Sequence, residues 1–309
     1  MRKLRLLFVA IAAFSNPLLA QNPAWEPGPG HLTLPIWPHG APPGQPYPGD
    51  EYNATNDKDA LIAGKTVIRL GNVSNPTITL YAPKGPNSGA AVVVFPGGSY
   101  HILAIDLEGT EVCDWLNSAG INCILLKYRV PDTGPYPKSP AALQDAQRAV
   151  GMVRAHAAEW HIDPHRIGVL GFSAGGHLAA ALSTHFDKHL YDPVDAADQS
   201  SCRPDFALLI YPAYLTVENQ NFALSADIPV TSNTPQTFLV QAENDSVHVE
   251  NSVTYFTALK SARVPAEMHL YAEGGHGYGL RRTALPVTTW PQSAELWLHT
   301  IHVLPGTTP

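Results

Sequence analysis

Apolar runs and amphipathic runs alternate along most of the chain. Six short runs are almost wholly apolar, which predicts strands buried on both faces at residues 90–95, 122–128, 166–172, 206–211, 237–241 and 268–272. Between and after them, apolar positions recur with helical spacing, which predicts helices at residues 106–119, 139–160, 174–186, 249–262 and 292–302. This order predicts an α/β fold with a mostly parallel central sheet and helices on both of its faces.

The N-terminal part of the chain has a different pattern. Residues 22–49 are crowded with Pro and Gly, so they cannot sustain a helix or a central strand. We therefore expect residues 21–60 to form an arm packed on the surface of a single domain, residues 61–309. At the start of that domain, two β-like segments at residues 65–70 and 77–81 are separated by turn signals, which predicts a hairpin at the sheet edge.

An irregular stretch at residues 213–235 interrupts the alternation of strands and helices. It follows the predicted strand that ends at Tyr211. Ligands of α/β sheets bind at the carboxyl ends of the strands, so an insertion at this point would overhang the ligand crevice. We expect residues 213–235 to form a cap over that crevice.

The first 20 residues combine a basic head, a short apolar run and a small residue, Ala20, before a polar one. This combination predicts a secretory signal peptide that is cleaved near Ala20, which would make the protein secreted or periplasmic. The apolar run is shorter than the roughly 20 residues that span a bilayer. An uncleaved membrane anchor is the alternative.

The charge of the chain disfavours anionic partners. The formal net charge is -7, and removal of Arg2, Lys3 and Arg5 with the predicted signal peptide would change it to -7 - 3 = -10. A strongly acidic surface repels phosphate backbones and anionic lipids, so we expect no nucleic-acid or membrane partner. The oligomeric state stays open.

Three cysteines, Cys113, Cys123 and Cys202, lack the C-x-x-C spacing of a zinc site, and we expect no metal. Two alternatives remain for Cys113 and Cys123. They could form a disulfide in an exported protein, or they could be small buried thiols.

The most informative motif lies between the strand at residues 166–172 and the helix that follows. There the chain reads Gly171-Phe172-Ser173-Ala174-Gly175, the spacing of a nucleophile elbow. A serine on a sharp strand-to-helix turn needs neighbours without side chains, because the strained backbone passes close to other segments. We therefore predict that Ser173 is a nucleophile.

A serine nucleophile needs a base and an acid that orients the base. His276 is the candidate base, since it lies in a glycine-rich loop directly after an apolar strand, and Asp245 is the candidate acid after another strand. The order serine, aspartate, histidine is that of an α/β hydrolase. Glu243 is an alternative acid, and His248 is a rival base that lies too close to Asp245 in the chain.

An oxyanion hole is the last part that acyl transfer requires. We expect its backbone donors to be the N–H of Ala174, which follows the nucleophile, and that of Gly98 or Ser99, in the Pro-Gly-Gly-Ser turn after the strand at residues 90–95. The acids that follow this turn, Asp106 and Glu108, are interpreted as a helix N-cap and a first-turn acid.

With these parts in place, the chain from about residue 65 onward resembles the α/β-hydrolase superfamily. The resemblance is closer to secreted bacterial carbohydrate esterases of the acetyl xylan and bifunctional feruloyl/acetyl xylan type. The segments that carry it are Pro96-Gly97-Gly98, Asp106-Leu107-Glu108-Gly109, residues 171–179, Asp245-Ser246-Val247, Gly275-His276-Gly277 and the arm phrase at residues 34–42. The chain departs from the family at Ser99, where a longer glycine run is common.

The resemblance implies a serine carboxylesterase that needs no cofactor and forms an acyl-enzyme. Its expected substrates are acetyl, or feruloyl, esters of plant cell-wall polysaccharide. Tyr100, His101 and Arg281 are the candidate substrate contacts, with Arg281 expected to meet an acidic sugar. The alternatives are a general short-chain carboxylesterase and a prolyl-peptidase-like serine hydrolase.

Overall fold

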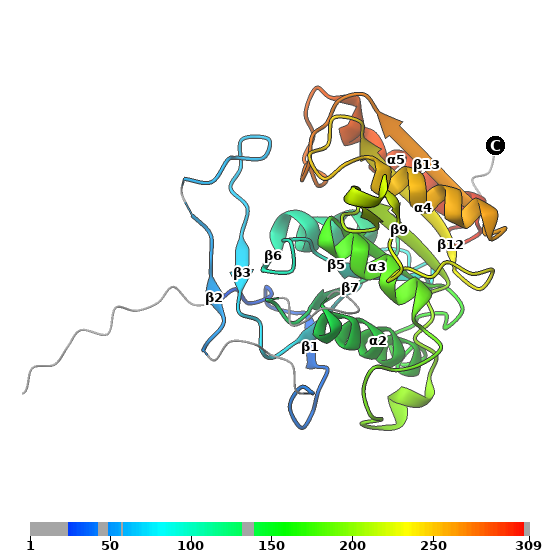
Figure 1. The fold of residues 1–309 in the computed structure, drawn as a ribbon. Helices are drawn as coiled ribbons and strands as arrows, with labels where there is room; N and C mark the ends of the chain where they lie inside the picture. Colours follow the sequence, from blue (N-terminus) through cyan, green and yellow to red (C-terminus); the bar gives the residue numbers. More distant parts are fainter. Residues whose placement is uncertain (1–23, 43–48, 57, 132–138, 306–309) are drawn as a thin grey trace, which may run out of the picture.

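An eight-stranded sheet forms the centre of the protein, in the strand order β1-β4-β7-β5-β8-β9-β12-β13 (Figure 1). The structure is a computed structural model and describes residues 24–42, 49–56, 58–131 and 139–305. The predicted signal peptide, residues 1–20, lies outside the described residues, and so do parts of the predicted arm.

Six of the eight strands run parallel. These are β5 (Ala91–Phe95), β7 (Asn122–Lys127), β8 (Ile167–Phe172), β9 (Phe206–Ile210), β12 (Gln236–Ala242) and β13 (Ala266–Tyr271). All residues of β5, β8 and β9 are buried, as expected for strands covered on both faces. The antiparallel strands β4 (Thr77–Tyr81) and β1 (Leu32–Pro35) extend the sheet at one edge. The prediction of a mostly parallel α/β sheet is confirmed.

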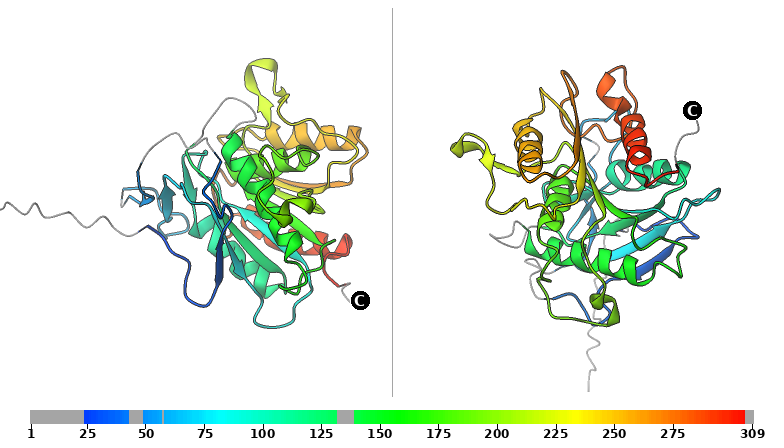
Figure 2. Two further views of the ribbon diagram at one scale, coloured as in Figure 1. Left: turned by 90° about the horizontal axis from the view of Figure 1, so that it is seen from below. Right: turned by 90° about the vertical axis from the view of Figure 1, so that its right-hand side faces the viewer.

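Helices cover both faces of this sheet (Figure 2). On one face lie α1 (Glu111–Ser118) and α5 (Trp290–Thr300), where Trp115 packs edge-on against Trp290 at 5.3 Å between ring centroids. On the other lie α2 (Pro140–Ala155), α3 (Ala174–Thr184) and α4 (Glu250–Ser261). Short helical turns occur at η1 (Asp106–Thr110), η2 (Ala196–Gln199), η3 (Glu218–Gln220) and η4 (Pro286–Thr289).

The predicted edge hairpin is wrong. β3 (Arg69–Gly71) does not pair with β4 but lies between β2 (Tyr52–Asn53) and β6 (Ile102–Ala104) in a separate antiparallel sheet. Its partner β6 comes from the segment after the Pro96-Gly97-Gly98 turn, so the pairing joins parts of the chain about 30 residues apart in sequence. Local turn signals could not indicate a partner that distant.

Residues 213–235 form a small hairpin, β10 (Thr216–Val217) and β11 (Ala223–Leu224), that lies along α4. Asn251 of α4 accepts hydrogen bonds through Oδ1 from the backbone N–H groups of Leu215 and Thr216. Thr254 of α4 donates to the Phe222 carbonyl. The insertion is therefore fixed to a helix at the side of the sheet.

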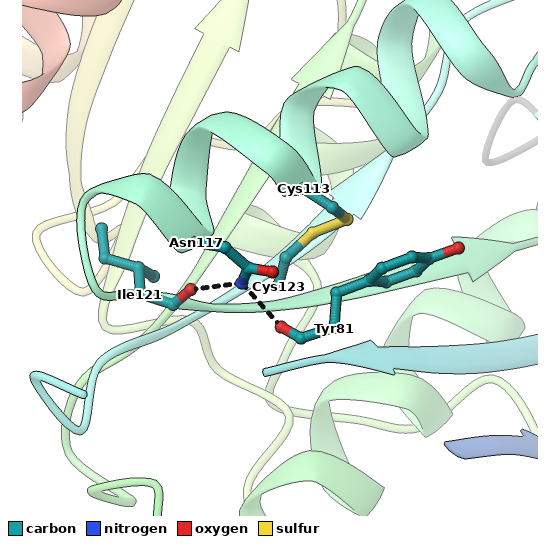
Figure 3. Close-up of a disulfide and its surroundings, with 5 residues drawn as sticks. All are labelled: Tyr81, Cys113, Asn117, Ile121 and Cys123. Atoms are coloured by element: carbon teal, nitrogen blue, oxygen red, sulfur yellow. Dashed lines mark hydrogen bonds between the residues drawn. A yellow bond between two sulfur atoms is a disulfide. The ribbon is translucent and has the colours of Figure 1, made fainter. Parts of the chain in front are cut away.

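A disulfide joins Cys113 of α1 to Cys123 of β7 (Figure 3). The side chain of Asn117 closes the same turn, because its Nδ2 donates to the carbonyls of Tyr81 at 2.8 Å and Ile121 at 3.0 Å. Helix α1 is thus tied to the strands beneath it, and of the two alternatives for these cysteines the structure has the disulfide. Cys202 is a buried free thiol.

The arm is held to the domain by buried polar contacts. Trp37 donates through Nε1 to Asp145 of α2 at 2.7 Å, and Asp145 also pairs with the buried guanidinium of Arg129. Arg148 donates through Nε to the Ile36 carbonyl. Within the ranges described, no helix is both long enough and apolar enough to cross a bilayer.

Candidate active site

Ser173 lies at a sharp turn where β8 ends and α3 begins. Its backbone has φ 52° and ψ -117°, a strained conformation for a residue with a side chain. A Cβ at Gly171 would come within 1.9 Å of the Gly175 carbonyl oxygen, and one at Gly175 within 2.0 Å of the Phe95 carbonyl oxygen. The turn can close only with glycine at both positions, so the steric reason given for the motif is confirmed.

Two loops bring a histidine and an aspartate to this serine. His276 follows β13, and its Nε2 lies 2.8 Å from Ser173 Oγ. Its Nδ1 lies 2.9 Å from Oδ1 and 3.0 Å from Oδ2 of Asp245, which follows β12. The Ser173–His276–Asp245 chain of contacts has the connectivity that activates a serine hydroxyl: the carboxylate fixes the tautomer, and Nε2 is left to accept the hydroxyl proton.

Asp245 is held in place by further donors. Its side chain is fully buried and accepts from the Val247 backbone N–H at 2.9 Å and from Gln241 Nε2 at 3.1 Å. Gln241 itself lies in β12 and accepts from Ser252 of α4 at 2.6 Å. The rival base His248 instead contacts Glu218 and the ring of Phe222. It is not brought to Ser173.

The turn that follows β5 lies beside the serine. Gly98 and Ser99 line the same cavity as Ser173, and both have positive φ, 132° and 57°. Within the part of the chain that the structure describes, the N–H groups of Gly98, Ser99 and Ala174 donate no hydrogen bond to another backbone group. The N–H groups of Gly98, Ser99 and Ala174 therefore stay the candidate donors of an oxyanion hole.

Glu108 has a place that the sequence interpretation missed. It is 4% exposed, and its Oε2 accepts from the Gly97 N–H at 2.7 Å while its Oε1 accepts from the Tyr211 hydroxyl at 2.7 Å. Asp106 accepts from the Ile68 N–H and pairs with Arg281. The predicted N-cap is wrong, because Ile105 precedes η1, whereas Glu108 does lie in the first turn as predicted. Both carboxylates also bond to partners far away in the chain.

Burial raises the pKa of the Glu108 carboxyl above its ordinary value, while the hydrogen bonds from Tyr211 and Gly97 act in the opposite direction. Tyr211 accepts from the Gly279 N–H at 3.0 Å, and its ring centroid lies 5.0 Å from that of His276. Glu108 therefore connects the Gly97 turn, through Tyr211, to the loop that carries His276.

Asn244 also acts on the His276 loop. Its Oδ1 accepts from the N–H groups of Gly274 and Gly275 at 3.0 and 2.9 Å. The residue directly before Asp245 thus fixes the loop that presents His276. Sequence reasoning singled out Asp245 and the glycines of the loop but gave no role to this side chain.

The cavity over Ser173 has a volume of about 250 Å³ and is mostly lined by the segments that flank β3 and β6. Val67, Ala104, Leu107 and the partly buried Ile62 form a small apolar cluster apart from the main core, and all four line this cavity. Its remaining lining residues are Arg69, Gly98, Ser99, Ile102, Glu108, Ser173, His276 and Gly277. None comes from residues 213–235, so the structure does not place the predicted cap over Ser173.

The three candidate substrate contacts do not line the cavity either. Tyr100 is buried, and its hydroxyl lies 2.7 Å from His177 Nδ1, while His101 is exposed on the outside of the turn. The guanidinium of Arg281 pairs with Asp106 and Glu111 and donates to the carbonyls of residues 62, 65 and 66. It supports the segment that carries Ile62 and is not available to an acidic sugar.

The fold is that of an α/β hydrolase. The BD-FAE family model matches residues 78–208. An acetyl ester-xyloside bifunctional hydrolase from Caldicellulosiruptor lactoaceticus is similar in structure, with 38% identity, a TM-score of 0.66, and coverage of 74% of this chain and 89% of that one. The chain belongs to the α/β-hydrolase esterases.

Two curated relatives agree with this family. An acetylxylan esterase from Xylanibacter ruminicola is 29% identical over 71% of this chain and 47% of its own length. An endo-1,4-beta-xylanase B from Butyrivibrio fibrisolvens is 31% identical over 60% of this chain and 32% of its own length. The chain thus spans less than half the length of these relatives.

Proposed function

We propose that this protein is an exported serine carboxylesterase that removes acetyl groups from acetylated xylan or its fragments. The observation that carries the proposal is the contact of Ser173 Oγ with His276 Nε2, in a cavity that also presents the free donors of Gly98 and Ser99. The names of the relatives support the substrate class. The basic and apolar run of the first 20 residues supports export.

Ser173 and His276 can hydrolyse an acetyl ester in two steps, acylation of the serine and deacylation by water. His276 takes the hydroxyl proton of Ser173 as Oγ attacks the ester carbonyl, and the negative oxygen of the tetrahedral intermediate is stabilised by the N–H groups of Ala174 and of Gly98 or Ser99. The C–O bond to the sugar breaks, and the sugar oxygen takes the proton from His276. Water then attacks the acetyl-serine carbonyl and gives one proton to His276. The bond to Ser173 Oγ breaks as Oγ takes that proton, and acetic acid leaves and loses its remaining proton to solvent as acetate.

The size of the cavity favours acetyl over feruloyl as the acyl group. At about 250 Å³, with the apolar side chains of Ile62, Val67 and Leu107 in its wall, it lies at or below the small end of ordinary ligand pockets. An acetyl group fits this space easily, whereas a feruloyl group would fill it with its aromatic ring. Ferulate release is the alternative product that the experiment must detect.

The test is release of acetate and ferulate from acetylated, feruloylated arabinoxylan by the purified protein, with Ser173→Ala as the matched control. We expect acetate, little ferulate, and a loss of at least about a thousandfold in the variant. If p-nitrophenyl acetate were cleaved but the polysaccharide were not, the protein would be a general short-chain carboxylesterase. If Ser173→Ala kept its activity, the proposed nucleophile would be wrong.

A further inference from the structure

The small sheet β2–β3–β6 has one face on the core and one face toward the active site. Leu70 and Leu103, which are paired in its register, are fully buried in the main core. Because side chains alternate along a strand, Arg69 and Gly71 of β3 lie on the opposite face, together with their partners Ala104 and Ile102 of β6. Three of these four residues, Arg69, Ile102 and Ala104, line the Ser173 cavity.

The same outer face continues onto β2 through Tyr52, which is paired with Gly71. Tyr52 is 47% exposed, so its ring is accessible from solvent. A Cβ at Gly71 would come within 2.6 Å of Tyr52 Cζ and 2.9 Å of its hydroxyl oxygen. The ring therefore lies close over Gly71 and points from β2 toward β6, and the absence of a side chain at Gly71 makes this placement possible.

A charged pair borders this aromatic surface. Arg69 Nη1 lies 2.8 Å from Asp59 Oδ2, and both side chains are only about one third exposed or less. Arg69 also lines the Ser173 cavity, and it lies two residues before Gly71 on β3. A guanidinium has five N–H donors in a plane, which leaves donors for a second ligand besides Asp59 and the Val67 carbonyl.

We propose that Tyr52, Gly71 and Arg69 form a subsite that binds a pyranose ring of the polysaccharide chain whose ester group lies at Ser173. A pyranose has an apolar C–H face that packs on an aromatic ring, and hydroxyl groups that bond to charged planar side chains. Neighbouring strands are about 4.8 Å apart, so β2 lies about 10 Å from the β6 wall of the cavity. An oligosaccharide spans that distance and an isolated acetyl ester does not.

This subsite rests on the proposed function, and substrates of two sizes test it. The quantity to measure is the ratio of kcat/KM for acetylated xylo-oligosaccharides to kcat/KM for p-nitrophenyl acetate. We expect Tyr52→Ala to lower this ratio about tenfold, and Tyr52→Phe, which keeps the ring, to lower it less than about twofold. Gly71→Ala should act like Tyr52→Ala, because the added methyl group displaces the ring.

The matched control is Leu296→Ala, which removes an exposed side chain from α5 and should leave the ratio unchanged. A second readout is independent of turnover: Tyr52→Ala in the Ser173→Ala background should weaken binding of unacetylated xylohexaose about tenfold in calorimetry. If the ratio and the binding were both unchanged in Tyr52→Ala, the subsite would be overturned. Acetate release by the wild type would in that case still support the proposed function. Absence of both release and binding in the parent proteins would overturn the function and the subsite together.

Discussion

Glu108 Oε1 accepts a hydrogen bond of 2.7 Å from the hydroxyl of Tyr211, and this bond connects the Gly97 turn to the loop that carries His276. The other carboxylate oxygen, Oε2, accepts a hydrogen bond from the Gly97 N–H, and the Tyr211 hydroxyl oxygen accepts one from the Gly279 N–H. Each bond of this network is buried, so each is strong and each leaves a costly unpaired group when it is removed. The relative position of the Gly97 turn and the His276 loop therefore depends on the side chains of Glu108 and Tyr211.

Tyr211→Phe tests that dependence. The variant keeps the ring beside His276 but leaves Glu108 Oε1 and the Gly279 N–H without a partner. We expect a loss of about 1–3 kcal/mol in the free energy of unfolding. Because the His276 loop loses one anchor, kcat on p-nitrophenyl acetate should fall about tenfold with KM changed less than about twofold. Urea unfolding and steady-state kinetics measure the two effects, and a KM effect alone would contradict the positioning role.

Glu108→Gln tests the electrostatic state of the same residue through pH. Burial raises the pKa of Glu108 in the folded protein above the ordinary value of 4.5, so the folded state binds this proton more tightly than the unfolded chain. This group's contribution to stability is complete below pH 4.5 and is lost as the pH rises through the folded pKa. The glutamine variant has no such loss.

The free energy of unfolding of Glu108→Gln minus that of the wild type should therefore increase as the pH rises above 4.5, and should become constant above the folded pKa. The difference measured well below pH 4.5, where Glu108 is protonated in the folded and the unfolded protein, reports the hydrogen bond that the amide cannot replace. Urea unfolding at a series of pH values measures both quantities. A difference that decreases with pH would mean that the hydrogen bonds of Tyr211 and Gly97 outweigh burial.

Asn244→Ala isolates the support of the histidine loop. The variant removes the acceptor of the Gly274 and Gly275 N–H groups, which are near the surface and can turn to water, so stability should change by less than about 1 kcal/mol. The loop nevertheless gains freedom, and kcat should fall about tenfold or more. Asn244→Asp keeps an oxygen acceptor and should recover most of the rate. Equal losses of kcat in Asn244→Ala and Asn244→Asp would show that the oxygen acceptor at residue 244 does not determine the rate.

The parts of the site that could be predicted are those encoded by short segments. Gly171, Ser173 and Gly175 are within one turn, and the glycine spacing follows from backbone clashes at that turn. Asp245 and His276 can be predicted to lie near Ser173 because each follows an apolar strand, and parallel strands bring their carboxyl ends to one edge. In these cases the local pattern contains the physical cause.

The parts that could not be predicted depend on partners far apart in the chain. Nothing near Glu108 in sequence indicates that its acceptors serve Gly97 and Tyr211, and the first-turn position made a helix role the simpler interpretation. Similarly, the pairing of β3 with β6 is decided by the side on which Leu70 and Leu103 reach the core. Periodicity shows which residues are apolar but not which of several sheets will bury them.

Arg281 also has partners far apart in the chain, and they include the segment that forms part of the cavity wall. Its Nη1 donates to the carbonyls of Lys65 and Thr66 at 3.0 and 2.8 Å, and its Nη2 pairs with Glu111 at 2.8 Å. The planar guanidinium thus joins helix α1 to the segment that carries Ile62 and Val67, two side chains of the cavity wall. A lysine ammonium keeps the charge but cannot reach carbonyls and carboxylates in several directions at once.

We therefore expect Arg281→Lys to loosen the cavity wall without disturbing the contact of Ser173 with His276. KM for acetyl esters should rise about three- to tenfold while kcat changes less than about twofold, and stability should fall by about 1–3 kcal/mol because part-buried hydrogen bonds to carbonyls and to Glu111 lose their donors. The rise in KM should be smaller for propionyl and butyryl esters than for acetyl esters, since a looser wall admits longer acyl chains. Kinetics with p-nitrophenyl esters of increasing chain length measure this, and a uniform loss in kcat for every ester would place Arg281 in the support of the triad instead.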